Sequence, residues 1–221
     1  EMKPRCKRRF ANCARQRMSE MHYHLCDLTN AKQIKQLVET TTDLFGGVDG
    51  LVNNAGGPPA GKFESLDDRD WEQAFNLNLL SYVRAIREVL PHMRRQGGGR
   101  IVNIASSAVK EPIDGLILSN TIRNGLVGMA KTLSRELAPD NILINTVAPG
   151  RIATDRLLEL ERQRAKEKGV SYQQVRSISE AEIPLGRYGT PEELAKVVAF
   201  LCSSVNTYIT GQVIVSWLMV A

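Results

Sequence analysis

Glycine is absent from the first 45 residues of this 221-residue chain. A fold that binds a dinucleotide usually places a glycine-rich loop after its first strand, because backbone N–H groups of that loop hold the pyrophosphate at a helix N-terminus. A complete unit of strand, glycine loop and helix is therefore excluded from this stretch. We expect any nucleotide-binding fold in this chain to have a truncated or degenerate first βα unit.

Cysteine and long apolar runs are also scarce. The four cysteines form no C-x-x-C pair, which excludes a small disulfide scaffold and predicts a reduced, intracellular protein. No run of about 18 apolar residues exists, so the sequence predicts no membrane span. The first 20 residues lack the apolar region of a secretory signal. We expect a cytoplasmic location.

Ligands for a metal are few as well. His22, His24 and Cys26 alternate, so on a strand they would share one face with a spacing that a metal could use. No fourth ligand lies nearby in the sequence. An ordinary strand with polar residues on one side is the better interpretation, and we predict no metal site.

Positive charge is concentrated at one end of the chain. Residues 1–20 hold seven Lys or Arg against two Glu, whereas residues 21–221 balance 22 basic against 22 acidic side chains. A basic segment of this kind either contacts nucleic acid or another anionic surface, or is a solvated terminus. We favour the solvated terminus, so nucleic acid is not an expected partner.

Short apolar runs alternate with longer helical patterns. Runs rich in Val, Ile and Leu are typical of strands covered on both faces, and the expected strands span residues 21–26, 48–53, 100–106, 142–147 and 212–219. Helical spacing predicts helices over residues 31–45, 65–95, 121–137 and 191–202. The alternation predicts an α/β protein with a Rossmann-like doubly wound parallel sheet. We expect one such domain over residues 26–221, after a basic segment over residues 1–25.

Three short motifs follow the expected strands, and one charged stretch follows the last of them. The motifs are Asn53-Asn54-Ala55-Gly56, Ser106-Ser107 and the run from Pro149 to Asp155. Ligands of open α/β sheets bind beyond the carboxyl ends of the strands. Small residues there let the backbone approach a flat ligand, and the asparagines can tie neighbouring strands together. Residues 151–184 are highly charged and less periodic, which indicates a helical insertion or lid over this edge.

These motifs resemble those of the short-chain dehydrogenase/reductase family, and within it the group similar to 3-oxoacyl-carrier-protein reductases. The resemblance runs from about Asp27 to about Ile214. It is carried by Cys26-Asp27-Leu28, the Asn-Asn-Ala-Gly motif, Asn76-Leu77-Asn78-Leu79, the run from Arg100 to Ser106, Pro149-Gly150 with Thr154, the run from Gly189 to Glu193, and Tyr208-Ile209-Thr210-Gly211.

The resemblance implies an NAD(P)-dependent oxidoreductase that interconverts a carbonyl and an alcohol, with a 3-oxoacyl-type substrate as one option. It implies adenine contacts for Asp27 and Leu28, a backbone wall beside adenine and ribose for Asn54, Ala55 and Gly56, and a clamp on the nicotinamide and its phosphate for Pro149, Gly150, Ile152 and Thr154. It implies a proton-relay water on Asn78. Ser106 corresponds to the serine that hydrogen-bonds the substrate carbonyl, with Ser107 as the alternative if the alignment slips by one.

The chain departs from the family where a tyrosine and a lysine are expected. Counting from Ser106, these positions hold Ser119 and Arg123. In the family a phenol, of ordinary pKa about 10, donates the proton as hydride arrives. A serine hydroxyl is far less acidic, and an arginine stays protonated, so it cannot relay protons. Arg123 could still hold ribose hydroxyls and stabilise a developing alkoxide. The active site is therefore atypical.

Three interpretations stay open at this point. A rearranged reductase could use another proton donor, such as Lys110, Tyr188 or water. Alternatively, the chain could be a catalytically weak or inactive nucleotide-binding or scaffold protein, or a decayed copy that keeps the fold. The cofactor is NADP or NAD, with NADP favoured because Arg15 faintly resembles the arginines that select the 2′-phosphate. We expect a small-molecule carbonyl or alcohol as substrate, and a homodimer or homotetramer formed through the helices over residues 65–95 and 121–137.

Overall fold

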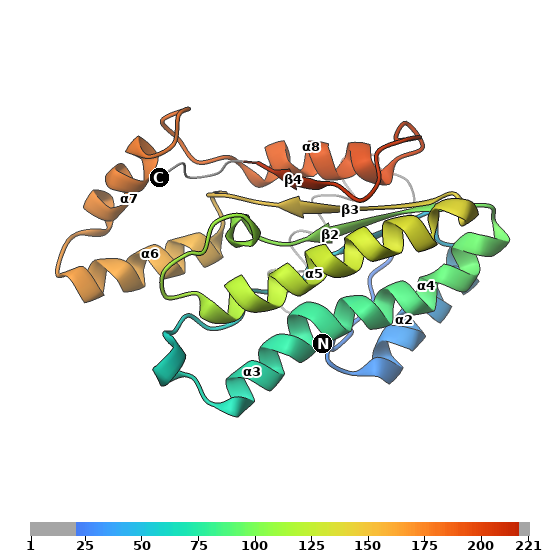
Figure 1. Cartoon of the computed structure of the whole chain (residues 1–221), viewed down its shortest axis with the longest axis horizontal. Coiled ribbons are helices and arrows are strands. Elements are labelled where there is room, and N and C mark those ends of the chain that lie inside the picture. Colours follow the sequence, from blue (N-terminus) through green and yellow to red (C-terminus); the bar gives the residue numbers. More distant parts are fainter. Residues whose placement is uncertain (1–20, 217–221) are drawn as a thin grey trace.

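Four parallel strands form the sheet of the computed structural model, which describes residues 21–216 (Figure 1). Their order is β1 (Gly50–Asn53), β2 (Gly99–Ile104), β3 (Ile142–Ala148) and β4 (Val213–Val215). Every residue of β3 is buried, as expected for a strand covered on both faces. The predicted doubly wound parallel sheet in a single domain is confirmed.

Helices cover both faces of this sheet. They are α2 (Ala31–Phe45), α3 (Asp68–Phe75), α4 (Ser81–Arg95), α5 (Ile117–Glu136), α6 (Asp155–Lys168), α7 (Tyr172–Ala181) and α8 (Pro191–Cys202). In Figure 1, α8 lies on one face, α4 and α5 lie on the other, and α6 and α7 extend beyond the carboxyl end of β3. No helix within residues 21–216 is long and apolar enough to cross a membrane.

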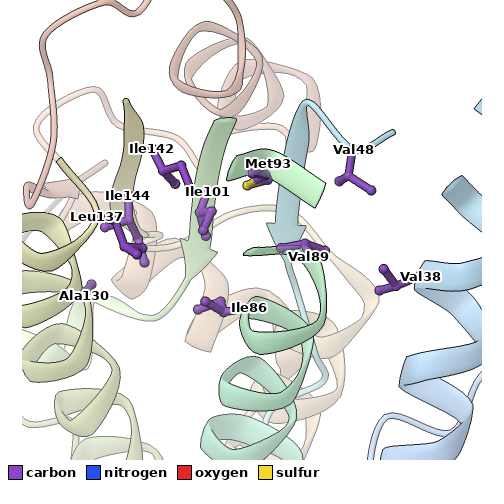
Figure 2. Packing of buried hydrophobic residues seen from close by; sticks show 10 residues of the cluster. All are labelled: Val38, Val48, Ile86, Val89, Met93, Ile101, Ala130, Leu137, Ile142 and Ile144. Carbon is purple, nitrogen blue, oxygen red and sulfur yellow. The ribbon is translucent and has the colours of Figure 1, made fainter. Parts of the chain in front are cut away.

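The main core fills the space between the sheet and the helices on one face. Figure 2 shows Ile101 of β2 and Ile144 of β3 facing side chains from α4 and α5. Met93 of α4 and both of these isoleucines are fully buried. Burial of each such side chain stabilises the fold by about 1.5–3 kcal/mol. This packing fixes α5 against the strand ends that form the site described below.

The strand predicted over residues 21–26 is wrong. This segment has no regular secondary structure, and it pairs with no strand of the described sheet, whose edge is β1. A strand is stabilised by a ladder of hydrogen bonds to a neighbour, and an extended segment without one gains nothing from β geometry. His22 and His24 are exposed, so they and Cys26 do not share a strand face.

The single helix predicted over residues 65–95 is interrupted. It begins at Asp68 rather than at residue 65, because Asp67 and Asp70 form a reciprocal capping box with each other's backbone N–H groups. Between α3 and α4 the residues Asn76–Leu80 form a π-helical turn. π-helical turns inside α-helices are often found at functional sites, and this one carries Asn78.

For the other elements the observed boundaries differ less from the predicted ones. The helix expected to begin at residue 121 begins at Ile117, so Ser119 lies inside α5. The strand expected over residues 212–219 is β4 (Val213–Val215), and residues 217–219 lie outside the described part of the chain, as do residues 1–20 of the basic segment predicted over residues 1–25. The helices predicted over residues 191–202 and 31–45 are confirmed as α8 and α2, and Gly46 ends α2 in the left-handed conformation. The lid predicted over residues 151–184 consists of α6 and α7.

Candidate active site

One cavity of about 2010 Å³ lies at the carboxyl ends of the strands, below α6 and α7 and beside α8. It brings together most of the site residues predicted from the sequence. Its walls include Asn54, Ala55, Gly56, Ser106, Ser107, Ser119, Arg123, Pro149, Gly150, Ile152 and Thr154. Asp27, Leu28 and Asn78 do not line it.

The strand ends that form the floor are tied to one another. Asn53 donates from Nδ2 to Oδ1 of Asn103 on the neighbouring strand at 2.9 Å, and both side chains are buried. The backbone N–H of Ser107 donates to the carbonyl oxygen of Pro149 at 2.9 Å. These hydrogen bonds between the sequence motifs fix the edge of the sheet beside the cavity.

Ser106 has a hydroxyl with a free donor. Its Oγ accepts a hydrogen bond from the backbone N–H of Ala108 at 3.2 Å. A hydroxyl has one donor and two acceptor positions, so the O–H of Ser106 remains available. Because Ser106 lines the cavity, that donor can serve a carbonyl oxygen bound there.

Ser119 and Arg123 lie one turn apart on α5, so they share a face. Both are buried, with 8% and 6% of their surfaces exposed, and both line the cavity. Nη1 of Arg123 donates to the carbonyl oxygens of Ile104 and Ala105, each at 2.9 Å. The guanidinium is therefore anchored at the end of β2, next to the residue that precedes Ser106.

The charge of Arg123 is not matched by an acid. Within residues 21–216 no carboxylate pairs with it, and burial lowers the pKa of its guanidinium while the nearby phenol of Tyr82 partly offsets that effect. Two charged side chains are buried in this part of the chain, and Arg123 is the cationic one. It is a cation held out of water beside an open cavity.

Tyr82 of α4 was missed by the sequence analysis. It is 1% exposed, and its hydroxyl accepts from the backbone N–H of Ala55 at 3.0 Å and donates to the carbonyl oxygen of Ile104 at 3.1 Å. Burial raises the pKa of this phenol, and the Ala55 N–H and Arg123 oppose that shift. Tyr82 therefore positions both Arg123 and the loop at Ala55. A weak signal was its place four residues after Asn78.

Replacing Tyr82 with Phe is expected to weaken NADPH binding about 5- to 30-fold, because a lost partner leaves the partly buried Ala55 N–H unsatisfied at a cost of about 1–2 kcal/mol. Fluorescence titration of NADPH measures this change. The melting temperature and the circular dichroism spectrum serve as controls for folding. Unchanged NADPH affinity in the folded variant would show that the Ala55 wall does not depend on this phenol.

Asn78 and Asp27 have surroundings different from those of the cavity residues. Asn78 is fully buried in the π-helical turn, and its Nδ2 donates to the carbonyl oxygen of Gly56 at 2.5 Å. Its Oδ1 has no protein partner, and a bound water would satisfy that acceptor. Asp27 is exposed, and hydrogen bonds from Thr29 to its carboxylate lower the pKa of that group. An adenine contact for Asp27 and Leu28 stays a prediction.

The two alternative proton donors considered from the sequence do not line the cavity. Lys110 is exposed. Tyr188 is buried, donates a hydrogen bond to the carboxylate of Glu161 on α6, and packs under the guanidinium of Arg176, 5.2 Å from the ring centre. The pair of Tyr188 and Glu161 therefore joins α6 to the loop before α8 and holds the lid together.

This pair predicts a dependence of stability on alkaline pH. Burial, together with the hydrogen bond to Glu161, raises the pKa of Tyr188 to about 12 from an ordinary value of 10. A pKa raised by folding means that the stabilisation is complete below about pH 10 and is lost as the pH rises through about 12. We expect the free energy of unfolding to fall more steeply over this range in the wild type than in Tyr188→Phe. Urea unfolding of the wild type and of Tyr188→Phe at about pH 8 and about pH 11 measures this difference. An equal drop in the free energy of unfolding in the two proteins would contradict the prediction.

Comparison with known proteins places this site in a family. A family model described as enoyl-(acyl carrier protein) reductase matches residues 2–216. The 3-oxoacyl-[acyl-carrier-protein] reductase FabG of Aquifex aeolicus is 38% identical over 188 residues, which cover 85% of this chain and 71% of that protein. The chain belongs to the short-chain dehydrogenase/reductase family of NAD(P)-dependent oxidoreductases.

Two further similar proteins support this family membership. Dehydrogenase/reductase SDR family member 4 of Oryctolagus cuniculus is 36% identical over 192 residues, which cover 86% of this chain and 70% of that protein. The crystal structure of a variant of actinorhodin polyketide ketoreductase with NADPH superposes with a TM-score of 0.90 at 31% identity, covering 97% of this chain and 83% of that one. That relative shows the fold with a reduced nicotinamide cofactor.

On one side of the cavity the backbone is accessible to a ligand. The backbone wall from Asn54 to Gly56 is open, since a Cβ added at Gly56 would meet nothing within 4 Å. Pro149 and Gly150 also line the cavity, as do Arg123 and the serines. Residues 21–45 contain no glycine, so no glycine-rich loop for the pyrophosphate lies in that part of the described chain.

Proposed function

We propose that the protein catalyses the interconversion of a carbonyl and an alcohol with a nicotinamide cofactor, and that Ser106, Ser119, Asn78 and Arg123 form its active site. The observation that supports this is the buried Arg123 cation anchored beside the free hydroxyl donor of Ser106. Both line the cavity whose backbone wall, Asn54 to Gly56, we assign to the cofactor.

The residues of the chain would act on the carbonyl oxygen. The cofactor supplies a hydride, which adds two electrons and one hydrogen to the carbonyl carbon as the C=O π bond breaks. Ser106 donates its O–H to the oxygen and thereby orients the substrate. The fixed charge of Arg123 stabilises the negative charge that develops on this oxygen. The oxygen then takes one proton, which completes the alcohol.

The source of that proton differs from the usual one. No tyrosine is found among the described residues that line the cavity, and the Ser119 hydroxyl is a far weaker acid than a phenol. We propose that water in the cavity supplies the proton, with Ser119 as a hydrogen-bonding relay. Replacing a positioned general acid by water lowers the rate about 10²- to 10⁴-fold, so slow turnover is expected.

NADP is the cofactor that we favour. A related ketoreductase crystallised with NADPH, and the basic N-terminal segment of this chain carries Arg15, which resembles the arginines that select the 2′-phosphate. That segment lies outside the described residues. Parallel titrations with NADPH and NADH decide the preference.

NADPH titration with a carbonyl panel tests the proposed function. Fluorescence titration reports binding, and the loss of NADPH absorbance with neutral ketones, diketones, acetoacetyl-CoA and oxo acids reports turnover. Binding with slow turnover of at least one carbonyl is expected. No binding at ~1 mM, which corresponds to about −4 kcal/mol, would refute the proposal.

A nucleotide-binding subunit without turnover is the second candidate. Ser119 in the place of the proton donor favours it, because the fold and cavity persist while the acid is gone. NADPH binding without consumption of any carbonyl in the panel would support this candidate over the reductase. A scaffold of this kind would also tolerate Ser106→Ala with no loss of its function.

Self-association is a further part of the proposal. The expected interface uses the helices over residues 65–95 and 121–137, and Phe75 of α3 is 43% exposed there. Light scattering during gel filtration measures the mass against 24.5 kDa for one chain. A mass of two or four chains is expected. The cytoplasmic location stays a prediction.

A further inference from the structure

Arg123 is a buried cation that lacks a formal counter-charge. Its Nη1 bonds two carbonyl oxygens and its guanidinium also has a side-chain hydrogen bond with the Tyr82 phenol, and all of these partners are neutral groups. A guanidinium carries five N–H donors. No carbonyl or carboxylate oxygen within residues 21–216 accepts from its Nε or Nη2. Burying an unpaired charge is costly, and the cost falls when an anion is bound beside it.

The other cations of the cavity differ from Arg123. Arg151 pairs with Glu182 at 3.1 Å, and Arg156 pairs with Glu159 at 3.3 Å. Lys62 and Lys168 are exposed, and Arg164 is half-buried. Water stabilises the exposed ammonium groups, so they have less need of a bound anion. Arg123 is therefore the cavity cation whose surroundings favour an anionic ligand most strongly.

The position of Arg123 limits where that anion lies relative to the reacting carbonyl. Nη1 is bound to the carbonyl oxygen of Ala105, the residue directly before Ser106. A carbonyl held by the Ser106 hydroxyl and an anion held by the guanidinium would therefore occupy neighbouring positions. Arginine binds a planar carboxylate through two parallel hydrogen bonds. A carboxylate next to a ketone is the defining feature of a 2-oxo acid.

We propose that the substrate carries a free carboxylate adjacent to its carbonyl, and that Arg123 binds that carboxylate. This rests on the proposed function and narrows it to 2-oxo acids and their 2-hydroxy acid products. The proposal separates this chain from its relatives named as 3-oxoacyl-carrier-protein reductases, because in a 3-oxoacyl group one carbon lies between the ketone and the acyl carbonyl, which is a thioester and carries no free carboxylate. Ser119 leaves the space beside Arg123 that a phenol would fill.

Binding of an unreactive 2-oxo acid analogue tests the proposal without turnover. Calorimetric titration compares oxamate with the neutral oxamide, using wild-type protein with and without NADPH. We expect oxamate to bind about 10- to 100-fold more tightly, which is the usual worth of hydrogen bonds to a charged group. We expect Arg123→Met to abolish that preference and Arg123→Lys to keep part of it. Arg164→Met removes another cavity cation and is expected to keep the preference.

Kinetics give a second readout. The wild type is expected to reduce 2-oxobutanoate with a kcat/KM about 10- to 100-fold above that for its ethyl ester. In Arg123→Met the kcat/KM values for the acid and the ester are expected to be equal. Equal binding of oxamate and oxamide, or loss of the preference in Arg164→Met instead, would overturn the inference. So would better reduction of the ester or of acetoacetyl-CoA, although the reductase function would then stand. Absence of all turnover would refute the function, and the oxamate comparison would still decide the carboxylate site.

Discussion

Replacing Ser119 with Tyr and Arg123 with Lys together is expected to raise kcat/KM for a neutral ketone about 10²- to 10⁴-fold, the usual worth of a positioned general acid. Ser119 lines the cavity on the same face of α5 as Arg123. A phenol at residue 119 would therefore reach the space above Ser106. A lysine at residue 123 would lower the pKa of that phenol. Initial rates of NADPH oxidation with a neutral diketone measure the gain.

Matched single variants separate the parts of this effect. Ser119→Phe adds the ring without the hydroxyl, so no gain is expected. Ser119→Tyr alone keeps a cation at residue 123, so part of the gain is expected. The double variant should keep only part of the preference for free carboxylates, as expected for Arg123→Lys alone. No gain in a double variant that folds and binds NADPH would show that the side chain at residue 119 does not reach the carbonyl.

Replacing Ser106 with Ala is expected to lower kcat/KM about 10²- to 10³-fold, which is the usual effect of removing one donor to a developing oxyanion. The Ser106 O–H is a free donor in the cavity, because its oxygen is held by the N–H of Ala108. Affinity for NADPH should change little, since Ser106 serves the substrate oxygen. Steady-state kinetics with 2-oxobutanoate measure the loss.

Ser107 provides the matched control. It is the next residue and lines the same cavity, but its backbone N–H is committed to Pro149. Ser107→Ala is expected to keep activity within about a factor of two to three, the range typical of a side chain with no part in the reaction. A large loss in Ser107→Ala with little loss in Ser106→Ala would assign the carbonyl contact to Ser107 instead.

The fold was predictable where local pattern and tertiary packing agree. Continuous Val and Ile runs predicted the buried strands β2 and β3. Pro191 is typical of a first helical turn, and α8 begins there, with a capping box between Thr190 and Glu193. Residues 21–26 have strand-like alternation but pair with no strand within residues 21–216. Strand pairing depends on the tertiary structure, which the local alternation of residues does not reveal, so the strand prediction was wrong.

The candidate site was predictable in its residues but not in their surroundings. Motifs at three strand ends and the spacing from Ser106 placed the cavity walls, because parallel strands end at the same edge of a sheet. The environment of Arg123 comes from β2 and from Tyr82 of α4, which lies 41 positions away, so no local pattern reveals it. Tyr188 looked available as an acid, yet it binds Glu161 of α6.

Transfer of deuterium from C4-deuterated NADPH tests the central claim most directly. The protein is incubated with the labelled cofactor and 2-oxobutanoate, and the product is examined by mass spectrometry. We predict 2-hydroxybutanoate that carries one deuterium on its carbinol carbon, and far less of it with Ser106→Ala. A folded protein that binds NADPH but yields no deuterated alcohol from this or any other carbonyl of the panel would contradict the claim that this cavity supports carbonyl reduction.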